Sequence, residues 1–355
     1  MKKLDYHFKN KKRIQKSILQ WYDVNGRHNL PWKNESIYRI WISEIMLQQT
    51  QVKTVIPYYE KFLESYPSIE SLINASQDDI LKHWAGLGYY RRAKNIYAAC
   101  RMIEKDFDSK FPITFDDILK LPGIGRTTAS AITTFSQNGK HSILDANVKR
   151  FLRRIYNLSE GDLKDTDDNL WFLSEDLLPN QRPDDFIQAY MDIGSLICKN
   201  KKPDCSLCPT SSLCLSLTNN NVETKQNKKS RIRKVKQKKN LWSVVVYDEN
   251  NKLYLEKISL GDLWSGLYSS PIFTSHNDLT QWAKSKKLID SISNNKWSFQ
   301  HRLSHINFTI TVFVCNLKKN KKVSLIEDNW YNLSNITIGI PKYQNKINEK
   351  FRQLI

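Results

Sequence analysis

The chain lacks any long hydrophobic run. No stretch of its 355 residues approaches the roughly 18 consecutive apolar residues that a membrane-spanning helix requires. The first 13 residues are polar and basic with no apolar segment behind them, which excludes a secretory signal of ordinary design. We therefore expect no association with a membrane and a cytoplasmic location, where the six cysteines are not expected to form disulfides.

Acidic residues are scarce relative to basic ones. The sequence holds 36 Asp and Glu against 55 Lys and Arg, a formal net charge of +19. A positive excess of this size favours a polyanionic partner, and nucleic acid is the commonest one. A coding bias toward Lys, Asn and Ile would produce the same excess, so the charge alone does not decide the partner.

Two hydrophobic periodicities divide the chain, whose length suggests two domains. Residues 14 to about 217 read as short amphipathic helices separated by Pro and Gly. Residues 218–240 carry nine Lys or Arg and one Glu, which predicts a flexible basic linker. Beyond it, apolar residues alternate in strand-like runs, as from Ile306 to Val314, with one helix-like segment at 277–288. The sequence thus predicts an all-α domain over 1–217 and an α+β domain over 241–355.

Four cysteines lie close together near the end of the helical part. Cys198, Cys205, Cys208 and Cys214 follow the spacing C-x6-C-x2-C-x5-C. One compact loop can point four thiolates inward around a metal centre. Zinc sites usually use two C-x2-C-like pairs, and only one is present, so a [4Fe–4S] cluster fits the spacing better. We expect the cluster to shape the loop structurally, with three lysines between the first two cysteines facing phosphates.

Two carboxylates stand in contrasting surroundings. Glu44 lies in an apolar helical stretch with Trp41 and Ile45 on its stripe, where poor solvation would raise its pKa and keep a proton available for general acid catalysis. An edge residue with no chemical role explains that position as well. Asp145 stands at the start of a second amphipathic helix, where it is either a helix N-cap, a catalytic carboxylate, or both.

Two glycine-containing turns complete the pattern. Gly123 and Gly125 open a helix in Leu121–Ala129, where backbone N–H groups can face a phosphate. An ordinary packing corner between two helices would look similar. In Gly86–Arg92, two glycines allow close backbone approach, two tyrosines offer stacking and two arginines offer phosphate contacts.

Together and in this order, these motifs resemble the helix–hairpin–helix DNA glycosylases, and specifically the MutY-type adenine DNA glycosylases. The resemblance runs from about Trp21 to the C-terminus. It rests on the following stretches: LPW (30–32), SEIMLQQTQV (43–52), GLGYY (86–90), LPGIGRTTA (121–129), ILDANVKR (143–150) and the four-cysteine loop.

The resemblance implies roles for the matching residues. Glu44 is implied to protonate the leaving adenine at N7 and to act on the water molecule in the later step. Asp145 is implied to stabilise the sugar cation or to bond to it transiently. The residues implied to contact base or DNA are Trp32 and Gln188 in the adenine pocket, Gln49 and Tyr89 at the gap left by the flipped base, Thr50 and Leu87 near the opposite base, and Gly123, Gly125 and Asn147 along the DNA. The cofactor implied is a [4Fe–4S] cluster on the four cysteines.

The C-terminal part resembles the Nudix-like domain of the same family. A working Nudix hydrolase holds magnesium with clustered glutamates, but no Glu occurs between Glu256 and Glu327. We therefore expect a reader of 8-oxoguanine, with Ser304 and His305 matching its contact loop. Leu303 and Ala146 depart from the usual Phe and Gly, and the first departure bears on how strongly 8-oxoguanine is distinguished.

Three functions compete on this evidence. The favoured one is a monomeric, monofunctional glycosylase that removes adenine opposite 8-oxoguanine or guanine in double-stranded DNA. A glycosylase-lyase resembling endonuclease III would carry a lysine nucleophile where this chain has Thr127. A non-catalytic iron–sulfur protein that binds damaged DNA would share the hairpin, the cysteines and the basic linker, but it would have no use for Glu44.

Overall fold

The chain folds into two compact units in a computed structural model that describes residues 2–137, 139–158, 166–222, 237–258, 264–303, 306–317 and 325–355. Unit 1 comprises Met1–Ile73 and Ala98–Ser230, and unit 2 comprises Asn74–Tyr97 and Arg231–Ile355. Most of the predicted linker, residues 223–236, lies outside the described residues. Strand β1 (Gln237–Tyr247) already includes residues 237–240, which the sequence analysis placed in the linker.

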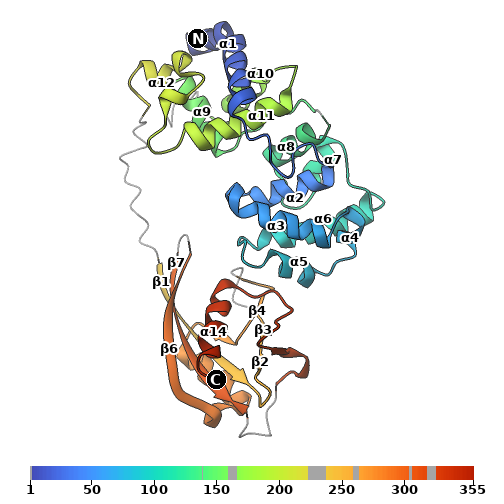
Figure 1. The fold of residues 1–355 in the computed structure, drawn as a ribbon, viewed down its shortest axis with the longest axis vertical. Coiled ribbons are helices and arrows are strands. Elements are labelled where there is room, and N and C mark those ends of the chain that lie inside the picture. Colours follow the sequence, from blue (N-terminus) through green and yellow to red (C-terminus); the bar gives the residue numbers. More distant parts are fainter. Residues whose placement is uncertain are drawn as a thin grey trace. The chain divides into compact units, whose positions relative to one another are not determined.

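Unit 1 is helical, as its periodicity predicted (Figure 1). Its helices are α1 (Lys2–Asn25), α2 (Ile37–Leu47), α3 (Val52–Ser65), α4 (Ile69–Ile73), α7 (Phe115–Lys120), α8 (Arg126–Gln137), α9 (Ala146–Ile155), α10 (Asp167–Leu177), α11 (Pro183–Asp192) and α12 (Leu215–Thr218), with α6 (Arg91–Asp106) shared between the units. A π-helical turn, Ile193–Ile197, and two 3-10 turns, Cys205–Leu207 and Ser211–Leu213, occupy the cysteine segment. No helix among the described residues is long and apolar enough to cross a bilayer.

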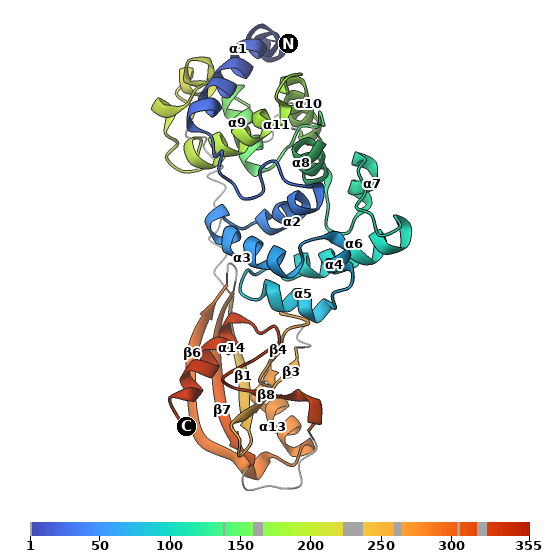
Figure 2. The same ribbon diagram turned by 45° about the vertical axis from the view of Figure 1, so that its right-hand side comes forward.

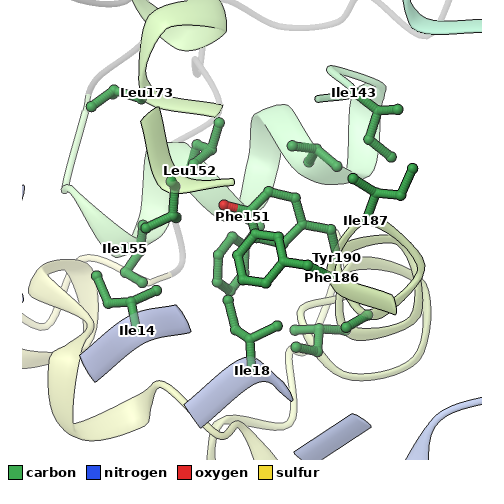
Figure 3. Close-up of a cluster of buried hydrophobic side chains, with 14 of the residues drawn as sticks. Ile14, Ile18, Ile143, Phe151, Leu152, Ile155, Leu173, Phe186, Ile187 and Tyr190 are labelled. Carbon is green, nitrogen blue, oxygen red and sulfur yellow. The ribbon is translucent and has the colours of Figure 1, made fainter. Parts of the chain in front are cut away.

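One apolar core joins the beginning of unit 1 to its end. Ile14 and Ile18 of α1 pack against Phe151 of α9 and against Phe186 and Tyr190 of α11 (Figure 3). All five side chains are at most 2% exposed, and burial of each contributes about 1.5–3 kcal/mol. The helices that carry Asp145 and Gln188 are therefore fixed by a shared, fully buried core.

Unit 2 is built on a mixed sheet of strand order β6-β7-β1-β2-β8, with β5 also paired to β1. Its long strands β6, β7 and β1 are seen in Figure 2. Its elements besides β1 are α5 (Gln77–Trp84), β2 (Lys252–Tyr254), β3 (Glu256–Lys257), β4 (Tyr268–Ser269), β5 (Ile272–Phe273), α13 (His276–Ser285), β6 (Ile292–Arg302), β7 (Ile306–Asn316), β8 (Trp330–Asn332) and α14 (Lys342–Arg352). β1 and β7 are parallel, and the other described pairs are antiparallel. Buried and partly exposed residues alternate along most of β7, which confirms the predicted half-buried strand.

Helices cover both faces of this sheet. On one face, Leu279 and Ala283 of α13 pack on Val244 and Val246 of β1. On the other, Tyr343 of α14 meets the Trp264 ring at 4.7 Å between centroids, and Trp264 in turn contacts Phe308 of β7. The predicted combination of a helical front with a C-terminal region of strands and helices is thus confirmed.

Segment 74–97 belongs to unit 2, although the sequence analysis assigned it to the helical domain. Within that unit, Lys257 forms a 2.9 Å ion pair with Asp78 at the start of α5, and Lys94 donates to the Ser265 hydroxyl at 3.0 Å. Contacts between residues so far apart in the chain do not affect the local hydrophobic periodicity, so the sequence could not predict them.

Candidate active site

Glu44 lies in the last turns of α2 among buried apolar neighbours. The helix begins at an N-cap, Ser36, whose hydroxyl accepts a hydrogen bond from the backbone N–H of Arg39. Trp41 and Ile45 are at most 1% exposed, whereas Glu44 itself keeps partial access to solvent. Burial and, to a smaller extent, the negative charge of Asp145 raise the pKa of Glu44 to about 7. A substantial fraction of this carboxyl is therefore protonated near neutral pH.

Asp145 is the N-cap of α9, as predicted. Its Oδ1 accepts the backbone N–H groups of Asn147 and Val148 at 2.9 and 2.7 Å, and its Oδ2 accepts Nδ2 of Asn147 at 3.1 Å. An ionised carboxylate is the natural acceptor for three N–H donors at the positive end of a helix. Unit 1 thus holds two carboxyl groups that influence each other electrostatically while standing in opposite environments.

Side-chain hydrogen bonds connect Asp145 to the cysteine segment. Arg150 donates to Oδ1 of Asn147 at 2.8 Å and to the backbone oxygen of Cys198 at 2.7 Å. Gly194 allows the two segments to approach, because a Cβ there would lie 2.7 Å from Cβ of Asn147. Asn147, expected at the DNA, therefore also has a structural contact within unit 1.

Trp32 and Gln188, both expected in the adenine pocket, line one cavity. Its volume is about 390 Å³, and its other lining residues are Tyr22, Leu30, Lys33, Asn34, Ile40, Phe135, Asp184 and Asp185. Lys33 donates to the Tyr22 hydroxyl at 2.9 Å and to Asp185 at 3.2 Å. Glu44 and Asp145 are not among the residues that line this cavity.

The predicted hairpin lies between α7 and α8. Gly123 has a φ of 83°, a left-handed conformation that favours glycine. Gly125 needs no such conformation, and a Cβ built there would meet no atom within 4 Å. Packing within unit 1 therefore does not require glycine at position 125, whereas the close approach of a ligand to the backbone would. Gln48 of the Gln-rich segment donates to the carbonyl oxygen of Gly123 at 3.3 Å.

The residues expected around the flipped base include two strained positions. Gln49, in unit 1, has a φ of 57° and is exposed, while Thr50 beside it is partly buried. Tyr89, in unit 2, has a φ of 50° and is 50% exposed, and Leu87 is buried. Left-handed backbone at a residue other than glycine costs of the order of 1–3 kcal/mol and is concentrated at functional sites.

Neither lysine nor another free amine occupies the position of a lyase nucleophile. Thr127 stands there, partly buried. The nearby Lys149 forms an ion pair with Asp167, its Nζ lying 2.8 and 2.7 Å from the two carboxylate oxygens. Ser304 and His305, expected at the 8-oxoguanine, lie outside the described residues.

All four clustered cysteines line a second cavity, of about 370 Å³. None of them forms a disulfide. Burial raises the pKa values of the Cys205, Cys208 and Cys214 thiols, an effect that a neighbouring metal opposes because it favours the thiolate. In the described part of the chain, no three His, Cys, Asp or Glu side chains approach closely enough to hold a single metal ion.

The structure also presents buried charged residues that the sequence analysis missed. Arg154 is 4% exposed and donates to Sγ of Cys198 at 3.3 Å and to the Lys199 and Asn200 carbonyl oxygens at 2.7 and 3.1 Å. Asp192, fully buried, accepts hydrogen bonds from Arg27 and Gln188. The i to i+4 spacing of Gln188 and Asp192 was visible in the sequence, but their partner Arg27 lies far away along it.

Residues 42–175 match the family described as "HhH-GPD superfamily base excision DNA repair protein". The solved structure of a thermostable thymine-DNA glycosylase is similar with a TM-score of 0.54 and 29% identity, over 59% of this chain and 98% of that one. An endonuclease III–DNA complex shares the fold with a TM-score of 0.51 and 20% identity, over 59% and 97% of the two chains. The fold and the site thus define a helix–hairpin–helix base excision repair protein.

Similar sequences narrow that class. An adenine DNA glycosylase of Buchnera aphidicola subsp. Schizaphis graminum is 42% identical, over 94% of this chain and 97% of its own length. The human adenine DNA glycosylase is 37% identical, over 56% of this chain and 38% of its own length. The chain belongs to the adenine DNA glycosylases, enzymes of DNA base excision repair that hydrolyse N-glycosyl bonds and act on DNA.

Proposed function

We propose that this chain is a monomeric, monofunctional glycosylase that removes adenine placed opposite 8-oxoguanine or guanine in duplex DNA. The observation that carries the proposal is the pair of carboxyl groups in unit 1. Glu44 has a pKa of about 7 because it is buried and near Asp145, while Asp145 accepts three N–H donors. One group can therefore donate a proton at neutral pH while the other stabilises a cation.

The reaction begins with extrusion of the adenine from the duplex, which costs a few kcal/mol and least at a mispair. Glu44 transfers its proton to N7 of the base, and the bond between C1′ of the sugar and N9 breaks with its electron pair going to the base. Asp145 stabilises the positive charge that develops on the sugar. Water then adds to C1′ and returns a proton to Glu44, leaving adenine and an abasic site.

The other contacts follow from the same proposal. Trp32 and Gln188 bind the flipped adenine, and Gln49 and Tyr89 occupy the gap that it leaves. Thr50 and Leu87 lie near the opposite base, and Gly123, Gly125 and Asn147 contact the DNA. The open space beside Gly125 supports close backbone approach to a phosphate. The ion pair of Lys149 with Asp167 supports a monofunctional reaction, because that amine is not free to attack the sugar.

A [4Fe–4S] cluster on Cys198, Cys205, Cys208 and Cys214 is part of the proposal. The four side chains line one cavity, and a multi-iron cluster spreads its ligands farther apart than a single ion does. When bound, the cluster would crosslink the segment through four thiolates. Arg154 would place its positive charge beside one of these thiolates, because its Nη1 lies 3.3 Å from Sγ of Cys198.

The domain division of the proposal is a glycosylase domain over 1–217, a basic linker from residue 218 to the start of β1 at Gln237, and a Nudix-like domain from there to residue 355. The last of these would recognise 8-oxoguanine through Ser304 and His305. Helices on both faces of a mixed sheet support a Nudix-like arrangement, and the absence of Glu between Glu256 and Glu327 argues against hydrolysis there.

The test uses a labelled duplex that carries adenine opposite 8-oxoguanine. We expect strand breaks only after treatment with hot alkali, since a monofunctional enzyme leaves an intact abasic site. Glu44→Gln should lower the single-turnover rate roughly 10²–10⁴-fold, whereas Glu60→Gln, at an exposed position of α3, should not. Breaks before alkali would indicate a lyase, and tight mismatch binding without adenine release would indicate a non-catalytic protein.

A further inference from the structure

Asp192 is a completely buried carboxylate at the end of α11, and the mechanism above makes no use of it. Its Oδ2 accepts the backbone N–H of Arg27 at 2.8 Å. Its Oδ1 accepts Nε of Arg27 at 2.7 Å and Nε2 of Gln188 at 2.7 Å, and Nη2 of Arg27 lies 2.6 Å from the same oxygen. A buried charge is costly unless it is paired and fully hydrogen-bonded, and here four N–H groups converge on it.

This arrangement determines which end of the Gln188 amide faces the cavity. A glutamine amide carries a donor end, Nε2, and an acceptor end, Oε1, and the two can exchange places by rotation. A carboxylate can only accept, so Asp192 retains the donor end. Gln188 lines the 390 Å³ cavity, and no described residue donates a hydrogen bond to its Oε1. Oε1 of Gln188, the acceptor end of the amide, is therefore the end that can bind a ligand.

We infer that Asp192 is a positioning residue that makes Gln188 selective for a purine with an amino group. The inference rests on the proposed function, in which Gln188 binds the flipped base. An acceptor held in place attracts the exocyclic N–H₂ of adenine and repels the carbonyl oxygen at the same position of hypoxanthine or guanine. An amide free to rotate could satisfy either base, so the selectivity depends on the carboxylate behind it.

The surrounding structure makes the arrangement rigid. Gln188 and Asp192 lie one turn apart on α11, on which Phe186 and Tyr190 are buried in the core of unit 1. Arg27 follows α1 in a tight turn closed by a 2.8 Å bond from the N–H of Gly26 to the carbonyl of Tyr22. A Cβ at Gly26 would lie 2.3 Å from the Tyr22 ring, so the turn requires glycine. Both partners of Asp192 are therefore presented by fixed backbone.

The test compares adenine with hypoxanthine, each opposite 8-oxoguanine in the same duplex, under single-turnover conditions with enzyme in excess. Asp192→Ala removes both acceptor oxygens, including the Oδ1 that retains the donor end of the Gln188 amide. Without that carboxylate the amide can rotate to suit either base. We expect the ratio of the adenine rate to the hypoxanthine rate to fall about tenfold, the effect of one hydrogen bond.

The control is a double-mutant cycle with Gln188→Ala. Alone, this substitution should lower the ratio by a similar factor, and adding Asp192→Ala to it should change the ratio no further. A purely structural role for Asp192 would slow the release of both bases equally and leave the ratio unchanged, which would overturn the inference. A ratio that falls equally in both backgrounds would also overturn it, because the effect would not pass through Gln188.

A second measurement applies if Asp192→Ala does not fold. The wild-type protein is crystallised with a duplex that carries a non-hydrolysable adenine nucleotide. Oε1 of Gln188 within hydrogen-bond distance of the exocyclic amino group supports the inference, and contact of Gln188 with a ring nitrogen acceptor instead overturns it. Wild-type protein that releases no adenine would contradict the proposed function itself, whereas release with an unchanged ratio contradicts only the role of Asp192.

Discussion

Removing the charge of Glu44 should stabilise the protein at alkaline pH while it abolishes activity. The native carboxyl has a pKa of about 7, against an ordinary value of 4.5. Between these values the native state holds more protons than the unfolded state, so its stability falls as the pH rises through that window. The shift of 2.5 corresponds to a cost of about 3 kcal/mol above pH 7, at 1.36 kcal/mol for each pH unit. Glu44→Gln carries no charge and avoids this cost.

The effect is measurable as a difference between two pH values. From pH 5.5 to pH 8, wild-type protein should lose about 2 kcal/mol relative to Glu44→Gln, because part of the cost is already present at the lower pH. Urea denaturation at both pH values, followed by circular dichroism of the helical signal, gives this difference. Glu60→Gln serves as the exposed control and should track wild type at both pH values. An equal stability difference for Glu44→Gln at pH 5.5 and pH 8 would refute the reasoning, because Glu44 would then be solvated and poorly suited to supply a proton.

Three further predictions concern the same unit. The single-turnover rate of adenine release should fall tenfold for each pH unit above about pH 7, as Glu44 loses its proton; a flat profile to pH 9 would contradict its role as the acid. Asp145→Asn should lose activity but change the free energy of unfolding by only a few tenths of a kcal/mol, because Asn also caps helices. Asp145→Ala should lose activity and also lower the free energy of unfolding by about 1 kcal/mol in a denaturation experiment, because the cap of α9 is removed. Arg154→Met should lower the melting temperature, because the carbonyl oxygens of Lys199 and Asn200 lose their donor. With the cluster of the proposed function it should also lower the iron content of the purified protein, and an unchanged melting temperature would show that the cysteine segment folds without Arg154.

Features that depend on local spacing could be predicted from the sequence. Asp145 was expected at a helix N-terminus and is the cap of α9. The alternation from Ile306 to Val314 predicted a half-buried strand, which β7 confirms. Four cysteines within one short segment were expected to surround a metal centre; they line one cavity, and their role as ligands stays a prediction. In each case the information lies within about 20 residues of sequence, the range over which turns and periodicity act.

Features that depend on pairing between distant residues could not be predicted. The hydrogen bond from Arg27 to Asp192 joins residues 165 positions apart, and neither residue is unusual in its own segment. The grouping of segment 74–97 with unit 2 has the same origin, since the ion pair of Asp78 with Lys257 spans 179 positions. The sequence could propose that Glu44 was poorly solvated, but its pKa depends on the extent of its burial and, to a smaller extent, on the charge of Asp145, and both are set by the fold.

The two carboxyl groups of the candidate site stand in opposite environments within one helical unit. Glu44 projects from a helix whose neighbours offer no charge to balance it, so burial favours its neutral form. Asp145 caps α9, where it accepts two backbone N–H groups that the helix end leaves without a partner and also the side-chain amide of Asn147. Its negative charge then acts back on Glu44 and raises the pKa of the acid further. Loss of the cap would therefore weaken α9 and also return Glu44 toward an ordinary acidity, so the stability of this helix end and the availability of the proton depend on the same carboxylate.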